Sequence, residues 1–262
     1  MLYYNQYVRA ESLEEAYDLY QKKNNFILAG MLWQKMRNKT MGTAIDLCGL
    51  GLDKIEETEE AFRIGAYVSL RDLETDEALN AYTGGAFRES VRHIVGVQFR
   101  NVATVGGSIW GRFGFSDVMT IFRALGAKVE LHHAGIMDLN DFVKLPRKTR
   151  DILVAVIVPK NVKGVVYVSQ RNQSTDFPVL TCAAAKTAGG FRVAIGARPG
   201  KAVLYTLQPN AAETPELTAA RFAAEVRANI RTESNMRGSA EYRNHLAGVL
   251  VKRAVLKLEG NR

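Results

Sequence analysis

The residues best suited to hold a ligand lie in segment 98–108, which reads QFRNVATVGGS. Its paired glycines, Gly106 and Gly107, free the backbone to present consecutive N–H groups to an anion. Thr104 and Ser108 add hydroxyl groups on either side. A diphosphate could therefore be held here without a cation, although a tight bulge needed only for packing would use the same residues.

The elements around this segment must position it. Residues 102–110 are apolar and β-branched, which predicts a strand in which Gly106 and Gly107 form a bulge or a close backbone approach. Ser116 and Asp117 can begin a helix that continues to about residue 125.

Other patterns in the first 160 residues indicate an α/β opening followed by further strands. A capping box at Ser12 predicts a helix over 12–23, and residues 30–40 are expected to form a loop or a short helix. Short apolar runs predict strands over 26–29, 44–47, 62–68, 128–131 and 152–158.

Beyond Pro159 the pattern becomes that of an antiparallel sheet. Strands are expected over 165–170, 179–187 and 191–197, the last two joined as a hairpin through Gly189 and Gly190. Two amphipathic helices follow, one containing Phe222 and one beginning near Ser239. Both are expected to cover one face of the sheet.

Composition describes a globular chain. The 262 residues are 47% hydrophobic and 24% charged, and charge-free stretches reach only 11 residues, so we expect no membrane span and no secretory signal. Cys48 and Cys182 lie 134 positions apart, and the four histidines follow no metal-ligand spacing. We therefore predict no metal site and no disulfide, in a reducing cytoplasm.

The net charge of +8 is concentrated near the C-terminus. Residues 221–262 hold nine Arg or Lys against four Glu, which accounts for +5 of the total. Such a face could attract nucleic acid, an acidic protein or an anionic cofactor, and it could equally be a solvated helical face.

The segment QFRNVATVGGS, followed by Ser116-Asp117, resembles the flavin-binding segment of the medium subunit of molybdenum-containing hydroxylases, the xanthine dehydrogenase and carbon monoxide dehydrogenase family. That family reads Q-I-R-N-x-A-T-[IV]-G-G-N before its Ser-Asp pair, so Ser108 replaces an asparagine. Weaker family features follow in the same order along nearly the whole chain: Ile64-Gly65-Ala66, the run from Asp151 to Pro159, and Ser239-Ala240-Glu241-Tyr242-Arg243.

The resemblance implies an α+β fold with a two-subdomain FAD-binding region of the PCMH type, followed by an antiparallel sheet covered by helices. The FAD-binding domain would span residues 1–160, with subdomains 1–54 and 55–160, and the C-terminal domain would span 161–262. The implied function is electron transfer by an oxidoreductase subunit. A 2Fe-2S small subunit would deliver electrons from a molybdopterin-carrying large subunit, and FAD on this chain would pass them to NAD or another acceptor.

By position, the resemblance places a group of residues at the cofactor and none in a catalytic role. Asp117 would accept hydrogen bonds from cofactor hydroxyls, Leu153 would touch the flavin edge, and the phosphate loops would contain Ala29, Gly30, Met31, Leu32, Trp33, Gln34, Thr104, Val105, Gly106, Gly107 and Ser108.

Two departures from the family leave alternatives open. Its first phosphate loop reads A-G-G-T-D, whereas residues 29–33 here read AGMLW, so this turn must survive with ordinary dihedral angles or belong to the core. The family also carries a lysine near the flavin in its third domain, where residues 167–177 have none. Arg171 would supply the charge there or lie on the surface.

The first departure also motivates a rival interpretation, an interaction subunit that keeps the fold without flavin. A nucleic-acid-binding protein, suggested only by the basic C-terminus, is a more distant one. The substrate pocket would lie on another chain, so purines such as xanthine, carbon monoxide, aldehydes and aromatic thioesters all remain open.

Overall fold

The chain folds into two compact units in this computed structural model, which describes residues 1–260. The first unit comprises Met1–Asp72, Val97–Gly111 and Ala127–Val158. The second comprises Leu73–Gly96, Arg112–Gly126 and Pro159–Arg262. Each unit is built from segments distant in sequence, and each is described on its own below.

A small parallel sheet opens the first unit. Its strands are β1 (Leu2–Arg9), β2 (Phe26–Ile27) and β3 (Lys39–Asp46), in the order β1-β3-β2. Between β1 and β2 lies α1 (Leu13–Gln21), which begins where the Ser12 side chain accepts the N–H of Glu15, as the capping box predicted. A short 3-10 helix, η1 (Gln34–Met36), connects β2 to β3.

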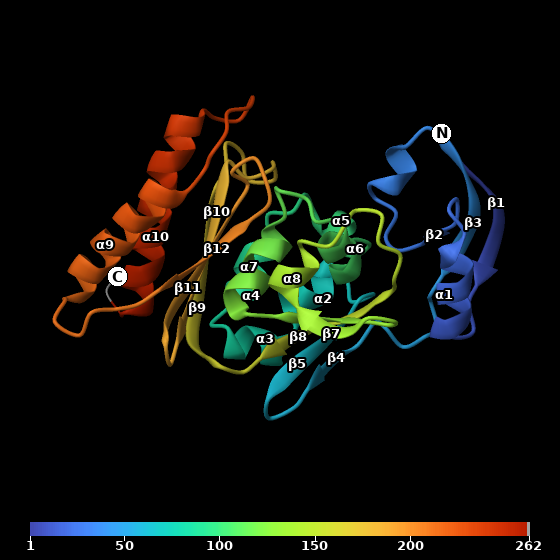
Figure 1. The fold of residues 1–262 in the computed structure, drawn as a ribbon, viewed down its shortest axis with the longest axis horizontal. Helices are drawn as coiled ribbons and strands as arrows, with labels where there is room; N and C mark the ends of the chain where they lie inside the picture. Colours follow the sequence, from blue (N-terminus) through green and yellow to red (C-terminus); the bar gives the residue numbers. More distant parts are fainter. Residues whose placement is uncertain (261–262) are drawn as a thin grey trace. The chain divides into compact units, whose positions relative to one another are not determined.

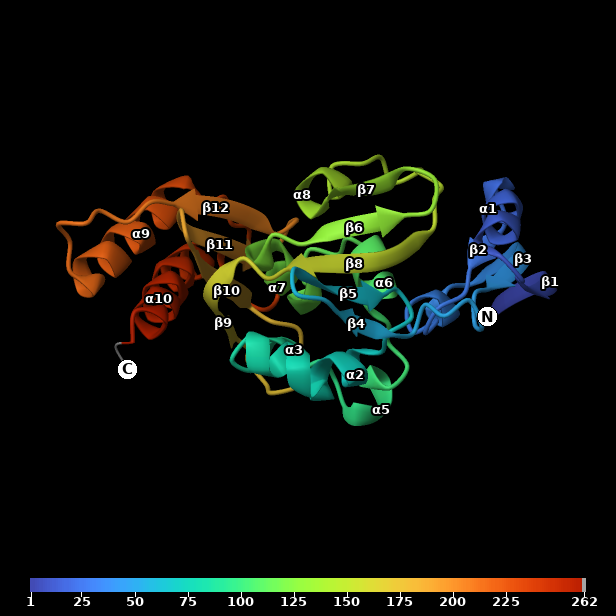
Figure 2. The ribbon, with the colours of Figure 1, turned by 90° about the horizontal axis from the view of Figure 1, so that it is seen from below.

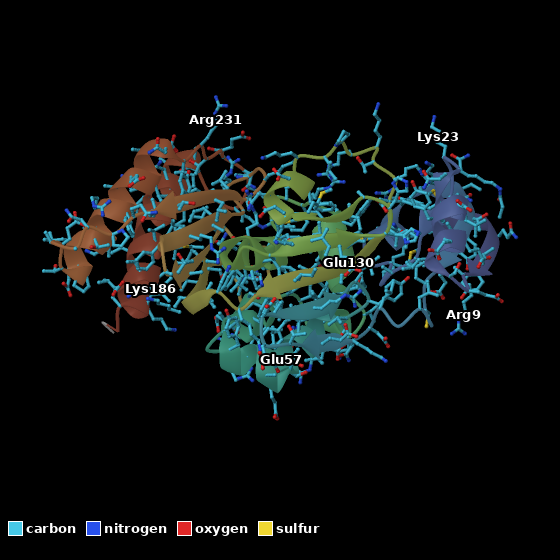
Figure 3. The ribbon with its side chains drawn as sticks, turned by 60° about the horizontal axis from the view of Figure 1, so that its bottom comes forward. Arg9, Lys23, Glu57, Glu130, Lys186 and Arg231 are labelled. Atoms are coloured by element: carbon cyan, nitrogen blue, oxygen red, sulfur yellow. The ribbon has the colours of Figure 1, made fainter. Side chains whose placement is uncertain are left out.

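A five-stranded sheet forms the rest of the first unit, in the order β4-β5-β8-β6-β7, as Figure 2 shows. Arg63 on β5 and Glu130 on β6, the latter labelled in Figure 3, form an ion pair with an N–O distance of 2.8 Å. The strands are β4 (Ile55–Glu57), β5 (Ala61–Gly65), β6 (Lys128–Leu131), β7 (Gly135–Asp138) and β8 (Leu153–Pro159). The helices of this part are α5 (Val97–Arg100), α6 (Val105–Trp110) and α8 (Leu139–Phe142). Another helix, α2 (Leu70–Thr75), begins in the first unit and ends in the second.

The second unit is built on a four-stranded antiparallel sheet in the order β12-β11-β10-β9. The predicted hairpin is confirmed, because Thr187 pairs with Gly190. The strands are β9 (Val162–Gln170), β10 (Leu180–Thr187), β11 (Gly190–Gly196) and β12 (Val203–Leu207). The helices are α3 (Glu77–Tyr82), α4 (Ala86–Val91), α7 (Asp117–Leu125), α9 (Pro215–Asn229) and α10 (Ala240–Leu258).

Alternation along β10 explains why both faces of this sheet are covered. Cys182 and Ala184 belong to the buried cluster that includes α9 and α10, which Figure 1 shows side by side along one face. Thr181 lies on the opposite face of the pleat and meets Thr120 of α7 through hydroxyl groups 3.0 Å apart. The predicted α+β fold, with two helices covering an antiparallel C-terminal sheet, is confirmed.

Three of the basic C-terminal residues are buried or paired, whereas Arg227, Arg231, Lys252, Arg253 and Lys257 are exposed. Arg243 is only 1% exposed, while Arg221 and Arg237 form ion pairs with Glu213 and Asp176. Arg231 does reach solvent, as Figure 3 shows.

In residues 1–260, no helix is long and apolar enough to cross a membrane. The same residues contain no group of three or more His, Cys, Asp or Glu side chains that could hold a metal ion.

Candidate cofactor site

The first loop, residues 29–34, leaves the end of β2 and passes close to the other glycine segment. A Cβ on Gly30 would lie 2.0 Å from the carbonyl oxygen of Val102 and 3.3 Å from the Cα of Ala103. Only glycine fits at such a distance. The loop is therefore pressed against the backbone that leads into Thr104, and the two predicted phosphate segments are neighbours within the first unit.

Met31 adopts a left-handed backbone with φ of 58°. The turn was expected to survive only with ordinary dihedral angles, and that part of the expectation is wrong. The backbone keeps a conformation that suits glycine, and a methionine has been accommodated in it. The replacement of the family's second glycine has thus not removed the turn.

Four backbone N–H groups of the first loop, those of residues 29–32, have no hydrogen-bond partner among the described residues. Within residues 1–260, no hydrogen bond is donated by the backbone N–H of Ala29, Gly30, Met31 or Leu32. The side-chain oxygen Oε1 of Gln34 is buried and likewise has no partner. Because buried or half-buried polar groups are normally paired, this loop has the donors and the acceptor that a bound polar ligand would satisfy.

The second segment, residues 104–108, is a helix start rather than a broken strand. Thr104 is the N-cap of α6, and its hydroxyl oxygen accepts the N–H of Gly107 at 3.0 Å. The N–H groups of Val105 and Gly106 donate to the carbonyls of Val68 and Ala66, and the N–H of Ser108 donates to the carbonyl of Thr104, in the usual i to i−4 pattern. The expectation of consecutive free N–H groups at this bend is therefore wrong, because these groups donate to the Thr104 hydroxyl and to backbone carbonyls.

The two glycines of this segment differ in role. A Cβ on Gly106 would lie 2.6 Å from the carbonyl oxygen of Ala66, so Gly106 is required for packing. Gly107 is exposed, and a Cβ there would meet only the Thr104 hydroxyl at 3.1 Å. Gly107 therefore faces outward and leaves room beside the helix start.

Tyr67 positions the first loop, a role that the sequence did not reveal. Its hydroxyl donates to the carbonyl of Leu28, directly before the loop, and accepts the N–H of Leu47 at 3.3 Å. Burial raises the pKa of Tyr67 well above its usual range, so the hydroxyl keeps its proton. A tyrosine directly after the Ile64-Gly65-Ala66 strand was the available signal.

Leu153 is buried, whereas Trp33 is exposed. Leu153 begins β8 beside Leu131 and is 6% exposed. Trp33 is 43% exposed, so it is not part of the core.

Asp117 lies in the second unit, at the start of α7, and is buried. Its Oδ1 accepts hydrogen bonds from the Tyr167 hydroxyl and from the Arg171 guanidinium. Burial raises the pKa of Asp117 to about 6, although Arg171 and Tyr167 act in the opposite direction. The carboxylate is thus held between two partners from β9 and the segment after it, which lie 50 and 54 residues away.

Arg171 does not lie on the surface, which was one of the two positions that its sequence context left open. Its side chain is 7% exposed and bonded to Asp117 and to the carbonyl of Asp176. A buried arginine therefore occupies the segment in which the family carries its lysine.

Two known families match the chain, one in its N-terminal part and one in its C-terminal part. Residues 3–161 match the family described as FAD binding domain in molybdopterin dehydrogenase, and residues 166–258 match CO dehydrogenase flavoprotein C-terminal domain. The chain is 26% identical to the uncharacterized protein YgfM of Escherichia coli K12, over 94% of this chain and 93% of that protein. It is 25% identical to the nicotine 6-hydroxylase medium subunit of Paenarthrobacter nicotinovorans, over 96% of each.

The fold agrees with that of a solved structure. Reconstituted CO dehydrogenase from Oligotropha carboxidovorans contains a chain that superposes with a TM-score of 0.86 at 23% identity, over 99% of this chain and 98% of that one. Both parts of this chain thus match, in order, the two domains of one kind of flavoprotein. The chain belongs to the family of FAD-binding medium subunits of molybdenum hydroxylases and is a subunit of an oxidoreductase.

Proposed function

We propose that this chain binds FAD between the first loop and the Gly107 side of α6, and relays electrons through it. Four unbonded N–H groups at residues 29–32 carry this proposal, because consecutive free amides suit a diphosphate. When bound, FAD supplies the ability to take up single electrons and to release a hydride, which no side chain provides. The chain's own residues bind and orient it.

The proposed contacts follow the two segments. The N–H groups of the first loop bind the diphosphate, and Gly107 leaves space beside it. Asp117 and Leu153 are retained as proposed contacts to cofactor hydroxyls and to the ring edge, and the whole set comprises residues 29–34, 104–108, 117 and 153. The proposed domain boundary lies near residue 160.

We further propose that the chain works between two partner subunits. A 2Fe-2S subunit delivers the electrons, and a molybdenum-binding subunit oxidises the substrate. This is supported by the relative named as a medium subunit, which aligns over nearly its whole length. NAD as acceptor, a xanthine-like purine as substrate and a reducing compartment such as the cytoplasm are the finer parts of the proposal.

The test is flavin binding by the full chain, followed by visible absorption and by quenching of flavin fluorescence. Gly107→Val should raise the Kd for FAD by on the order of tenfold or more, because the new side chain fills the outward space. Its effect on unfolding should stay below about 1 kcal/mol, since only the Thr104 hydroxyl must move.

Gly189→Val is the matched control. Gly189 is also exposed, a Cβ added there would meet nothing within 4 Å, and the residue lies in the other unit. This variant should bind FAD like the wild type. A wild-type chain that stays colourless after incubation with FAD would instead favour the flavin-less interaction subunit.

A further inference from the structure

Gln34 carries an unpaired buried acceptor. Its Oε1 has no hydrogen-bond partner, and it is the one buried side-chain oxygen or nitrogen in this condition among the described residues of the first unit. The others found in residues 1–260 are guanidinium nitrogens of the second unit. A buried acceptor without a donor costs stability, so a protein that retains one has an arrangement that another molecule can complete.

The neighbouring side chains cannot take its place. Met31, Leu32 and Trp33 separate Gln34 from Gly30, and none of them has a side-chain oxygen. Gln34 is therefore the only side-chain oxygen acceptor in the loop 29–34. The same loop holds the four unbonded N–H groups. Donors for an anion and one acceptor thus lie within six consecutive residues.

The four N–H donors and the single acceptor together indicate which part of a bound dinucleotide lies near Gln34. In FAD, the groups on either side of the diphosphate are the ribose and the ribityl chain, and both carry hydroxyl groups. A hydroxyl is a donor of the kind that Oε1 lacks. We propose that the Gln34 carboxamide accepts a hydrogen bond from a sugar or ribityl hydroxyl next to the diphosphate. This inference rests on the proposed binding of FAD at the first loop.

An acceptor that is completed only by the ligand has a signature that a structural residue lacks. Removing it should weaken ligand binding without weakening the empty protein, because the empty protein loses only an unpaired buried group. A glutamine that stabilised the fold would behave in the opposite way.

The experiment compares Gln34→Met, which keeps the length of the side chain and removes the oxygen, with the wild-type full chain. The apo form of each is titrated with FAD by fluorescence quenching, and its thermal midpoint is recorded without FAD. We expect Kd to rise about five- to tenfold in Gln34→Met. We expect its apo midpoint to be unchanged or higher.

Gln6→Met on β1 is the matched control, because Gln6 is exposed and receives the same change. It should alter neither readout. A Kd within twofold of wild type, or an apo midpoint lowered by several degrees, overturns the role of Gln34 while leaving FAD binding intact. Failure of the wild-type chain to bind FAD overturns the proposed function, and the role of Gln34 falls with it.

Discussion

Replacing Asp117 by asparagine tests which of two opposing effects controls the buried group formed by Asp117, Tyr167 and Arg171. Burial disfavours the ionised carboxylate, whereas Arg171 and the Tyr167 hydroxyl favour it. The structure gives the larger effect to burial, and the pKa of Asp117 rises from an ordinary 3.8 to about 6. That difference corresponds to about 3 kcal/mol between the ionised and the protonated forms.

The direction of the pH dependence follows from proton uptake. Between about pH 4 and pH 6, the folded protein holds a proton on Asp117 that the unfolded chain has released. Asp117 therefore contributes stability below pH 4, and this contribution is lost as the pH rises through about 6. The asparagine of the variant does not titrate, so the variant lacks this dependence. Any offset from differences in packing and hydrogen bonding between the asparagine and the protonated aspartic acid does not change with pH.

Urea unfolding of the wild type and of Asp117→Asn at pH 4, 5, 6 and 7 measures the effect. The free energy of unfolding of the wild type, minus that of the variant, should fall by about 3 kcal/mol from pH 4 to pH 7. A difference that rises with pH would refute the reasoning, because the Arg171 pair would then outweigh burial. A constant difference would show that Asp117 has an ordinary pKa.

Two further predictions concern backbone geometry and a buried arginine. Met31→Val should lower the free energy of unfolding by more than about 1 kcal/mol, because a β-branched residue fits φ of 58° poorly. Met31→Asn should be tolerated, because asparagine adopts this conformation more readily. Equal urea midpoints for the two variants would contradict this prediction. Arg243→Met should cost about 3–5 kcal/mol, since it strands the carbonyls of Val179, Glu233 and Gly238, and Arg253→Met on the exposed face of α10 should cost little.

Much of the fold could be predicted from the sequence, in those elements where the local pattern and the tertiary packing favour the same structure. The β6 bounds, the start of α7 at Asp117 and the hairpin between β10 and β11 follow from alternation, capping and paired glycines. β1 was missed because its side chains are mostly exposed, so it shows no hydrophobic alternation.

The segment around residues 102–110 shows how tertiary structure overrides propensity. Its β-branched residues predict a strand, but the Thr104 hydroxyl caps a helix, and Gly106 packs against the backbone of Ala66. The resulting short helix satisfies its first amides internally. Sequence spacing alone could not distinguish a glycine that presents an amide from one that allows a close approach.

The group around Asp117 could not be assembled from sequence for a different reason. Tyr167 and Arg171 lie 50 and 54 residues further along the chain, and no local pattern connects them to α7. Only the packing of α7 on the antiparallel sheet brings them together. The charge on Arg171 was visible, but its burial was not.

The first loop shows how a turn can survive the loss of a glycine. Its shape is fixed from outside the loop, by the Tyr67 hydroxyl on the Leu28 carbonyl and by the contact of Gly30 with Val102. A backbone so determined can hold Met31 in a strained conformation, which costs about 1–2 kcal/mol. The N–H groups then keep their orientation although position 31 carries a methionine. If the loop binds FAD as proposed, we expect this binding to depend on Gly30 and Tyr67 more than on the residue that replaced the second glycine.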